Sequence, residues 1–535
     1  MRFPHIDDRR LFDGLSILFL AAIAVLIGFI FQDYGVSTDE ILRNNYGQAL
    51  YRFFASGFKE NRAQHFGVGG YYGGLFDLVA ILLSKVLPFG QYETRHLLGA
   101  VVGWLGLVGC WRMARWLFDP AAGFFTLVLL AATPVYFNHM FINPKDLPFA
   151  VGYAWSLYLV MRCIDGLPKV PVARAVGLGV ALGLTLCIKI PVAIVGLYLI
   201  AGIVLMAWVQ HRKGWMETSL SSYAGQTALR LLLPAGALAY LMMIALWPWA
   251  WLSPILNPLK ALVTFTNYTH WKGKAILDGV EYASDKIPAY YLPKYIIIVL
   301  PEITVALLAA GIGIGIWLFV RRLRSGAWGK TEVHIAVLLM AATAPVAAAI
   351  VLKSNVYSGM RQFLFVVPPL VVLAGATLSY LFGRTRHRLK KIHSLPLLAL
   401  LVAYFVYHAW VMITLHPYQY IYYNALVGGV PGAAGKYEGD YWVTSYREAT
   451  RFVIDQVQEI KADPKSPRTY RVFTVHCPFC VEYYLPKNIK ITNNPRNADF
   501  YILSTRRNWD RMIPGKEILR ISRQGMLLTV VKSRK

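Results

Sequence analysis

Eleven apolar segments, each about as long as a bilayer is thick, constrain the fold of this chain more than any other feature. They occupy residues 14–32, 96–117, 121–138, 147–163, 175–190, 191–209, 229–249, 295–320, 333–352, 362–382 and 394–415. The hydrocarbon core of a bilayer is about 30 Å thick, which takes about 20 apolar residues in a helix. With 56% hydrophobic and only 15% charged residues, the sequence predicts an all-α polytopic membrane protein with about 11 transmembrane helices.

The segment 71–88 is apolar but shorter than most of these spans, and it carries Asp77 and Lys85. Charges inside a span are costly, whereas a helix in the membrane interface keeps them close to water. We therefore expect a helix that lies along the membrane surface between the first and second spans.

Positive charge alternates between the loops. The chain has 54 Lys and Arg residues against 28 Asp and Glu residues, a net charge of +26, but this charge does not gather on one soluble face as nucleic-acid binding would require. The basic clusters fall in every second loop, as the positive-inside rule describes for cytoplasmic loops. The N-terminus is then cytoplasmic, with the first span as an uncleaved anchor. The chain divides into a membrane domain, residues 1–415, and an outward C-terminal domain, residues 416–535. Within the membrane domain, three outward loops cover residues 33–95, 139–147 and 250–294.

The C-terminal tail has the patterns of a soluble domain. Residues 445–461 have helical periodicity, and the segments 469–476, 498–505 and 525–533 have the length and apolar content of strands. These patterns predict a small extracytoplasmic α/β domain.

Two cysteines of the tail, Cys477 and Cys480, form a Cys-x-x-Cys motif. In an oxidising compartment such a pair closes a disulfide, which is the interpretation that we favour. A redox or metal-binding role with His476 is the alternative, although a metal site of this type needs a second ligand pair.

Charged residues crowd against the outward ends of the spans at four places. These are Asp39 and Glu40 with Arg43 one helical turn on, Lys145 and Asp146, Lys189, and Arg361. Each place has an ordinary structural alternative: a helix N-terminus for the first, a turn with its own ion pair for the second, and snorkelling for the two lone cations. Their common depth on one face instead indicates an acid/base site beside an anion site. This pairing suits group transfer from a phosphorylated lipid.

Three short motifs at these places resemble those of a known superfamily. They are "TDE" at 38–40, "KDLPF" at 145–149 and "GLGVALGLTLCIK" at 177–189. Together they resemble the GT-C membrane glycosyltransferases, in the branch that holds the protein O-mannosyltransferases and the aminoarabinose lipid A transferase. The resemblance covers roughly residues 10–380 and implies a GT-C fold.

The resemblance also implies an activity. It is the inverting transfer of a sugar from a polyprenyl-phosphate-linked donor to a hydroxyl of a lipid, glycan or protein acceptor, at the periplasmic face of a bacterial inner membrane. The implied catalytic carboxylates are Asp39, Glu40 and Asp146, with Asp39 as the base and Asp146 orienting the acceptor or positioning Lys145. Lys189 and Arg361 stabilise the phosphate that leaves. No metal cofactor is expected.

Two departures from the branch concern the donor phosphate. Arg43 follows Asp39 by four positions instead of three, and only His65 stands where the branch has a lysine. The contact of that lysine is therefore either missing here or supplied by His65 or Arg361, and Arg43 is a further candidate contact to the donor phosphate. On the acceptor side, with Lys145, the tail motif at 416–449 brings Glu438 and Asp440 to the membrane surface.

Two other kinds of protein are alternatives to an enzyme. One is a transporter or flippase of a lipid-linked glycan, and the other is a membrane scaffold without catalytic activity. A transporter favours inverted repeats, broken helices and charges in mid-span. We predict unbroken spans whose charges gather at one face, which favours the enzyme.

Overall fold

The computed structural model describes residues 6–266, 273–388, 391–461 and 469–534. Among these residues, nine helices are long and apolar enough to cross a membrane. Four of these spans coincide with one whole helix: α4 (Gln91–Leu117), α7 (Asp146–Asp165), α15 (Glu302–Arg324) and α16 (Lys330–Val351). Two more lie within α1 (Ile6–Ile30) and α18 (Lys391–Leu415). The last three join consecutive elements: η2 (Ile190–Ala193) with α9 (Ile194–Arg212); α10 (Leu220–Thr227), η3 (Ala228–Leu232) and α11 (Leu233–Leu246); and η4 (Arg361–Val366) with α17 (Val367–Arg388).

The two remaining predicted spans are helical but not regular. Segment 121–138 is divided into α5 (Pro120–Ala131) and α6 (Pro134–Ile142), which meet at an angle of 65°. The prediction that every span is unbroken is therefore wrong here, because Pro134 cannot continue the hydrogen bonding of α5 and disfavours helical geometry at Thr133. Segment 175–190 forms α8 (Val172–Leu186), a shorter apolar helix of 15 residues that packs against α7 and α11.

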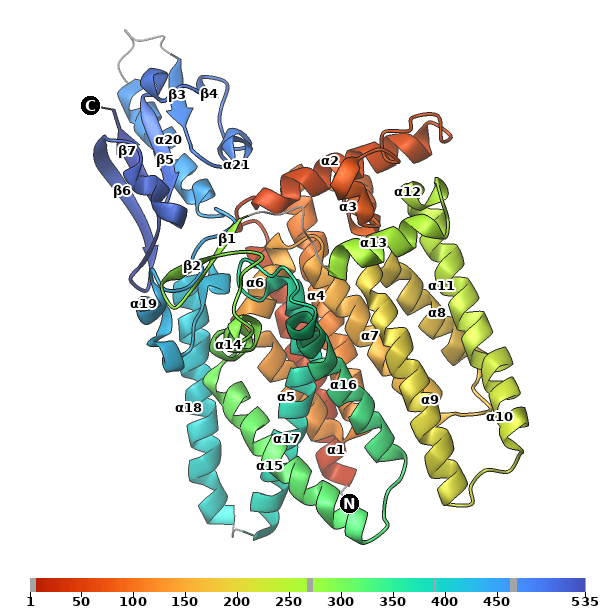
Figure 1. Ribbon diagram of the computed structural model, residues 1–535. Coiled ribbons are helices and arrows are strands. Elements are labelled where there is room, and N and C mark those ends of the chain that lie inside the picture. The colour runs from red at the N-terminus through yellow and green to blue at the C-terminus, as the bar shows by residue number, and fades with distance from the viewer. Residues whose placement is uncertain (1–5, 267–272, 389–390, 462–468, 535) are drawn as a thin grey trace.

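Short elements cover one end of the helix bundle, which we call the sheet end (Figure 1). The predicted interfacial segment 71–88 holds α3, whose 10 residues are too few to cross a bilayer. It packs against α2 (Thr38–Ala55). The bounds of α3 are Leu75–Ser84. The other elements here are η1 (Gly67–Tyr71), α12 (Pro248–Trp251), α13 (Leu256–Thr266), the hairpin of β1 (Lys274–Leu277) and β2 (Val280–Ala283), and α14 (Tyr291–Val299).

The C-terminal region forms the α/β unit that the sequence predicts. After η5 (Gln419–Ile421), η6 (Ala425–Val427) and α19 (Gly429–Ala433), the helix α20 (Tyr446–Lys461) precedes a five-stranded sheet of order β4-β3-β5-β7-β6. The strands are β3 (Tyr470–Phe473), β4 (Ile489–Ile491), β5 (Phe500–Ser504), β6 (Lys516–Arg523) and β7 (Met526–Ser533), with α21 (Pro478–Glu482) and the turns η7 (Pro495–Asn497) and η8 (Arg506–Arg511) between them. β3 pairs in parallel with β4 and β5, whereas β5, β7 and β6 are antiparallel.

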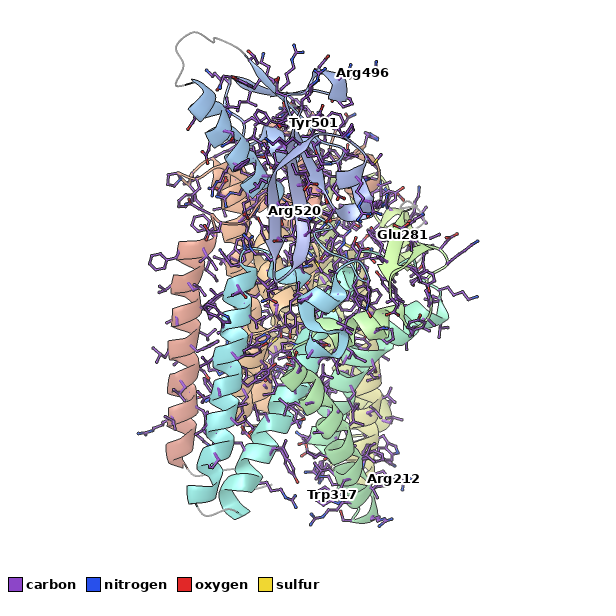
Figure 2. The ribbon with its side chains drawn as sticks, turned by 90° about the vertical axis from the view of Figure 1, so that its left-hand side faces the viewer. Arg212, Glu281, Trp317, Arg496, Tyr501 and Arg520 are labelled. Carbon is purple, nitrogen blue, oxygen red and sulfur yellow. A yellow bond between two sulfur atoms is a disulfide. The ribbon has the colours of Figure 1, made fainter. Side chains whose placement is uncertain are left out.

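Burial of an apolar stripe holds α20 in this unit. Ala449, Val453 and Val457 recur four residues apart on one face of the helix, and all three are fully buried. Figure 2 shows Tyr501 and Arg520 of the sheet at the end of the molecule opposite to Arg212 and Trp317. The sheet therefore stands beyond one end of the bundle.

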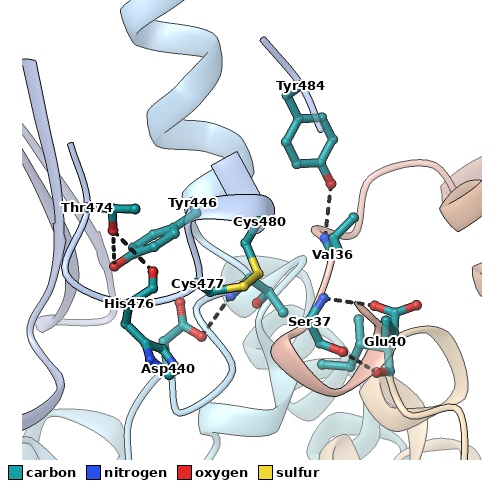
Figure 3. The surroundings of a disulfide bond; sticks show 12 residues. Val36, Ser37, Glu40, Asp440, Tyr446, Thr474, His476, Cys477, Cys480 and Tyr484 are labelled. Atoms are coloured by element: carbon teal, nitrogen blue, oxygen red, sulfur yellow. Dashed lines mark hydrogen bonds between the residues drawn. A yellow bond between two sulfur atoms is a disulfide. The ribbon is translucent and has the colours of Figure 1, made fainter. Parts of the chain in front are cut away.

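The C-terminal unit docks on the start of α2 through the segment that holds α21 (Figure 3). The hydroxyl of Tyr484 accepts a hydrogen bond from the backbone N–H of Val36 (2.9 Å), and Tyr483 donates to Glu93 (2.7 Å). Gly35 allows this approach, because a Cβ atom there would lie 2.1 Å from the carbonyl oxygen of Thr444. The chain just before Asp39 is thus held from both the membrane domain and the C-terminal unit.

The structure pairs Cys477 with Cys480 in a disulfide at the start of α21 (Figure 3). We expect the double substitution Cys477→Ser, Cys480→Ser to lower the stability of the C-terminal unit by about 2 kcal/mol or less, because the closed loop is short. Thermal unfolding of the purified protein, with and without reductant, measures this loss. Activity per folded molecule should be retained. A well-folded but inactive double variant would instead assign redox chemistry to the pair.

Candidate active site

Five charged side chains meet at the sheet end of the bundle and form what we call the charged cluster: Asp39, Lys145, Asp146, Lys189 and Arg361. Asp39 Oδ2 lies 2.8 Å from Lys145 Nζ and 2.7 Å from Arg361 Nη1. Asp146 Oδ1 lies 2.6 Å from Lys189 Nζ, and its Oδ2 lies 3.7 Å from the same Arg361 Nη1. Arg361 therefore bridges the two carboxylates. The four places that the sequence set at one depth thus contribute side chains to a single site.

Helix ends and turns from four parts of the chain place these side chains. Asp39 stands in the first turn of α2, and Arg361 begins η4. Asn143 forms the turn before α7, where its Oδ1 accepts from the backbone N–H groups of Lys145 (3.3 Å) and Asp146 (2.9 Å). Such side-chain acceptors satisfy N–H groups that a helix start leaves unpaired.

The end of α8 is fixed to the interfacial segment just before Lys189. The N–H of Leu75 donates to the carbonyl of Cys187 (3.0 Å). A Cβ atom on Gly73 would lie 1.9 Å from that same carbonyl oxygen, so only glycine fits there. This close approach holds Lys189 at the membrane surface beside the interfacial helices.

The charged cluster holds three cations and two carboxylates, so it carries one net positive charge when all five are ionised. Asp146, Lys189 and Arg361 are buried, whereas 23% of the Asp39 side chain is exposed. Burial alone would raise the pKa of Asp39, but Lys145 and Arg361 outweigh it and hold that pKa well below its usual range. Arg361 Nε is buried and has no hydrogen-bond partner among the described residues. The cluster therefore has positive charge and a spare donor for an anion.

Glu40, predicted as the second catalytic carboxylate, points to a different set of partners. Its Oε2 accepts from the backbone N–H of Ser37 (2.8 Å; Figure 3). Its Oε1 lies 3.1 Å from His96 Nε2. These contacts hold the start of α2. The structure thus separates the two adjacent carboxylates: Glu40 stabilises the helix start, and Asp39 belongs to the charged cluster.

The two remaining predicted donor contacts, Arg43 and His65, also lie elsewhere. Arg43 Nε donates to Asp77 Oδ2 (2.9 Å), and Arg95 Nη2 donates to Asp77 Oδ1 (2.6 Å). All three of these side chains are buried, and they form a second ionic group that joins α2, α3 and α4. His65 is exposed on the loop after α2.

The two tail residues predicted on the acceptor side, Asp440 and Glu438, differ in their contacts. Asp440 accepts from the backbone N–H groups of Thr444 and Ser445, each at 3.0 Å, and from the hydroxyl of Tyr420, so its oxygens are occupied by a turn. Glu438 is also buried. Burial raises its pKa, and the charge of Arg506 opposes this rise only in part.

Two aromatic residues and a histidine at the site were missed by sequence reasoning. The ring of Trp442 lies 5.0 Å from Arg361 Cζ, and Tyr441 OH lies 3.0 Å from His139 Nε2. The acidic residues of the tail motif were predicted at the site. The adjacent Tyr-Trp pair that follows them is the sequence feature that could have indicated Tyr441 and Trp442. Aromatic residues next to a membrane are usually interfacial anchors, so their type alone does not identify a site.

A pocket of about 800 Å³ lies between the turn of the β1–β2 hairpin, the region of α14 and the segment 426–437. Asp278, Lys294 and Tyr437 line it, and Asp278 Oδ1 lies 2.6 Å from both Lys294 Nζ and Tyr437 OH. Its lining residues do not include the charged cluster. We base the candidate site on the cluster, where the ionisable groups converge.

Comparisons with known proteins show what the chain and its fold are similar to. Residues 79–255, which include Lys145, Asp146 and Lys189, match the family model for dolichyl-phosphate-mannose-protein mannosyltransferase. A search of curated proteins finds no match. The chain has the fold of the archaeal oligosaccharyltransferase AglB from Archaeoglobus fulgidus, with a TM-score of 0.50, 12% identity, and coverage of 91% of this chain and 69% of AglB.

ArnT from Cupriavidus metallidurans also matches over nearly its whole length. The apo structure gives a TM-score of 0.48 with 17% identity, and the structure bound to undecaprenyl phosphate gives 0.46 with 16% identity. Both comparisons cover 97% of this chain and 98% of ArnT. The predicted resemblance is borne out to this extent: residues 79–255 are similar to the dolichyl-phosphate-mannose-protein mannosyltransferase family, and the fold is that of AglB.

Proposed function

We propose that the protein transfers a sugar from a polyprenyl-phosphate-linked donor to an acceptor hydroxyl, at the outer face of a bacterial inner membrane. The observation that carries this proposal is the charged cluster, where the partly exposed carboxylate of Asp39 lies beside Lys145 and Arg361, and Lys189 pairs with Asp146. The matched family uses a lipid-phosphate sugar, as its description says. AglB, which has a similar fold, has been determined in complex with a dolichol-phosphate.

In this reaction Asp39 acts as the general base. It removes the proton from the acceptor hydroxyl, whose oxygen then forms a bond to the anomeric carbon while the bond from that carbon to the phosphate oxygen breaks. The attack comes from the face opposite to the phosphate, so the configuration at the anomeric carbon inverts. The polyprenyl phosphate leaves with the bonding electrons, and Lys189 and Arg361 stabilise the charge that develops on it.

The donor phosphate also makes Asp39 a stronger base. In the structure Lys145 and Arg361 hold the pKa of this carboxyl low, and a carboxylate with a low pKa accepts a proton weakly. A phosphate that draws either cation toward itself weakens the ion pairs with Asp39 and raises that pKa. Proton removal is then favoured only when the donor is bound.

Asp146 and Lys145 place the acceptor next to Asp39, and Glu438 borders the site from the C-terminal unit. We propose no metal cofactor, because the cluster itself supplies positive charge to the phosphate. Activity should therefore be unchanged by EDTA. A loss of activity in EDTA that a divalent cation restores would contradict this part of the proposal.

The test is sugar transfer by the purified protein in lipid nanodiscs that contain a polyprenyl-phosphate sugar. Mass spectrometry should detect consumption of the donor and release of polyprenyl phosphate when the acceptor is present. Glycolipids and glycoproteins of cells with and without the protein identify the sugar and the acceptor. A protein that moves the donor across the bilayer without consuming it is a flippase, and this proposal is then wrong.

The same proposal predicts which side of the membrane the site occupies. Figure 1 shows the N-terminus of α1 and the C-terminal sheet at opposite ends of the molecule, and Arg212, in a predicted cytoplasmic loop, lies away from the sheet in Figure 2. An alkaline phosphatase fused to the C-terminus should be active in a bacterial host, because that enzyme folds only outside the cytoplasm. A fluorescent protein fused at the same place should be dark. The reverse pattern would place the charged cluster on the cytoplasmic side.

A further inference from the structure

A sharp turn before α20 carries Tyr441 and Trp442 and belongs to the C-terminal unit. Asp440 accepts from the N–H of Ser445, and the Ser445 hydroxyl bonds to the hydroxyl of Thr529 in β7 (2.8 Å). Arg506, which follows β5, donates through Nη1 to the carbonyl of Tyr441 (3.0 Å). The turn therefore moves with the C-terminal sheet.

The Trp442 side chain of this turn packs on the bridging arginine of the charged cluster. It is buried, and its ring centroid lies 5.0 Å from Arg361 Cζ. A desolvated guanidinium on an indole face is held by a cation–π interaction. The ring of Tyr357 lies 5.2 Å from the same Cζ. Held by these rings, Arg361 points Nη1 at Asp39 and Asp146, and its Nε stays unpaired among the described residues.

Tyr441 reaches the other carboxylate of the charged cluster through two side chains. Asn143 Nδ2 lies 2.9 Å from His139 Nδ1 and 3.3 Å from Asp146 Oδ2, so its two hydrogens serve both acceptors. His139 Nδ1 then accepts, and its Nε2 carries the hydrogen that it donates to Tyr441 OH (3.0 Å). Asn143 thus sets the tautomer of His139, and Tyr441, which accepts from Nε2, holds the ring in place and, through Asn143, the orientation of Asp146.

We propose that Tyr441 and Trp442 are positioning residues through which the C-terminal unit completes the site in the membrane domain. Trp442 presents Arg361 to the donor phosphate, and Tyr441 orients Asp146 toward the acceptor. The inference rests on the proposed function and deepens it. It predicts different kinetic defects for the two residues, because they act on different substrates.

The first test measures binding of a polyprenyl phosphate to purified protein. Trp442→Leu keeps an apolar side chain but removes the aromatic face, and it should weaken binding about tenfold or more. Trp442→Phe, which retains a face, should recover most of the affinity. Tyr446→Phe is the matched control, since Tyr446 lies in the same unit and bonds to Thr474 and Ser504 without contacting the cluster. Its affinity should equal that of the wild type.

The second test uses Tyr441→Phe, which removes only one hydroxyl. We expect a kcat about threefold to tenfold lower, with polyprenyl-phosphate affinity unchanged, because a single hydrogen bond of the acceptor-side chain is lost. Comparison with Tyr446→Phe separates this effect from loss of stability in the C-terminal unit. Thermal unfolding of every variant confirms matched folding.

Three outcomes overturn the inference. If Trp442→Leu is folded and binds polyprenyl phosphate as tightly as the wild type, Trp442 does not position Arg361, and the proposed function is unaffected. If Trp442→Leu does not fold, the Tyr441→Phe protein decides the question. A kcat equal to that of the wild type would show that this turn does not complete the site. If the wild-type protein binds no polyprenyl phosphate, the proposed function fails, and the inference fails with it.

Discussion

Replacing Asp39 by asparagine should lower the rate of sugar transfer by about 10²–10⁴-fold, the usual loss when a general base is removed. Asparagine keeps the size of the side chain but cannot accept the proton of the acceptor hydroxyl. It also raises the net charge of the cluster, so binding of a polyprenyl phosphate should be retained. The measurement is transfer from a polyprenyl-phosphate donor by purified protein, with donor binding measured in parallel.

Glu40→Gln is the comparison for Asp39→Asn on the adjacent residue. A glutamine can still accept from the N–H of Ser37, as in an ordinary capping arrangement, so the start of α2 should be preserved. The effect of Glu40→Gln on the rate of sugar transfer should be much smaller than that of Asp39→Asn. An Asp39→Asn protein within about threefold of the wild-type rate would contradict the catalytic assignment, because removal of an essential group lowers kcat far more.

The largest expected effect on stability is that of Asp77→Asn. Asp77 is fully buried between Arg43 and Arg95, and loss of its charge leaves two buried guanidinium groups side by side. Removing one partner of a buried ionic group costs about 3–5 kcal/mol. The thermal unfolding temperature of the purified protein should therefore fall sharply, and α2 should become more accessible to proteolysis.

Asp13→Asn is the matched control for this substitution. Asp13 pairs with Arg115 at 2.6 Å, but both side chains are partly exposed, and such pairs contribute at most about 1 kcal/mol. The two variants make the same chemical change in different surroundings. If Asp77→Asn lowers the unfolding temperature no more than Asp13→Asn does, the buried ionic group is not important for stability.

The membrane helices were predictable because their signal is local. A run of about 20 apolar residues identifies a span without knowledge of its neighbours. Every predicted span contains a helix in the structure, although the span 295–320 is interrupted at Leu300 and Pro301 between α14 and α15. The break at Pro134 was also present in the sequence. It was overlooked because the apolar residues continue through it, and composition does not reveal a change of direction.

The convergence of the charged cluster was predictable from depth alone. Asp39, Asp146 and Arg361 each stand at the same end of a span, so topology brings them to one face. The separate roles of Asp39 and Glu40 were not predictable, because successive helical residues point about 100° apart. Which of the two meets Arg361 depends on the packing of α2 against α3 and α4, and that packing involves Asp77 and His96, far away in the sequence.

The bridge between Asp39 and Arg361 joins residues 322 positions apart, and Trp442 covers it from still further along the chain. At about 5–20 residues per second, a ribosome takes roughly 20–80 s to synthesise the residues between Asp39 and Trp442. During that interval only the spans already synthesised are inserted, and the site is incomplete. Sugar transfer by this chain should therefore begin only after the last span has been inserted and the C-terminal sheet has folded, so a ribosome-stalled or truncated product is inactive even when all its membrane helices are in place.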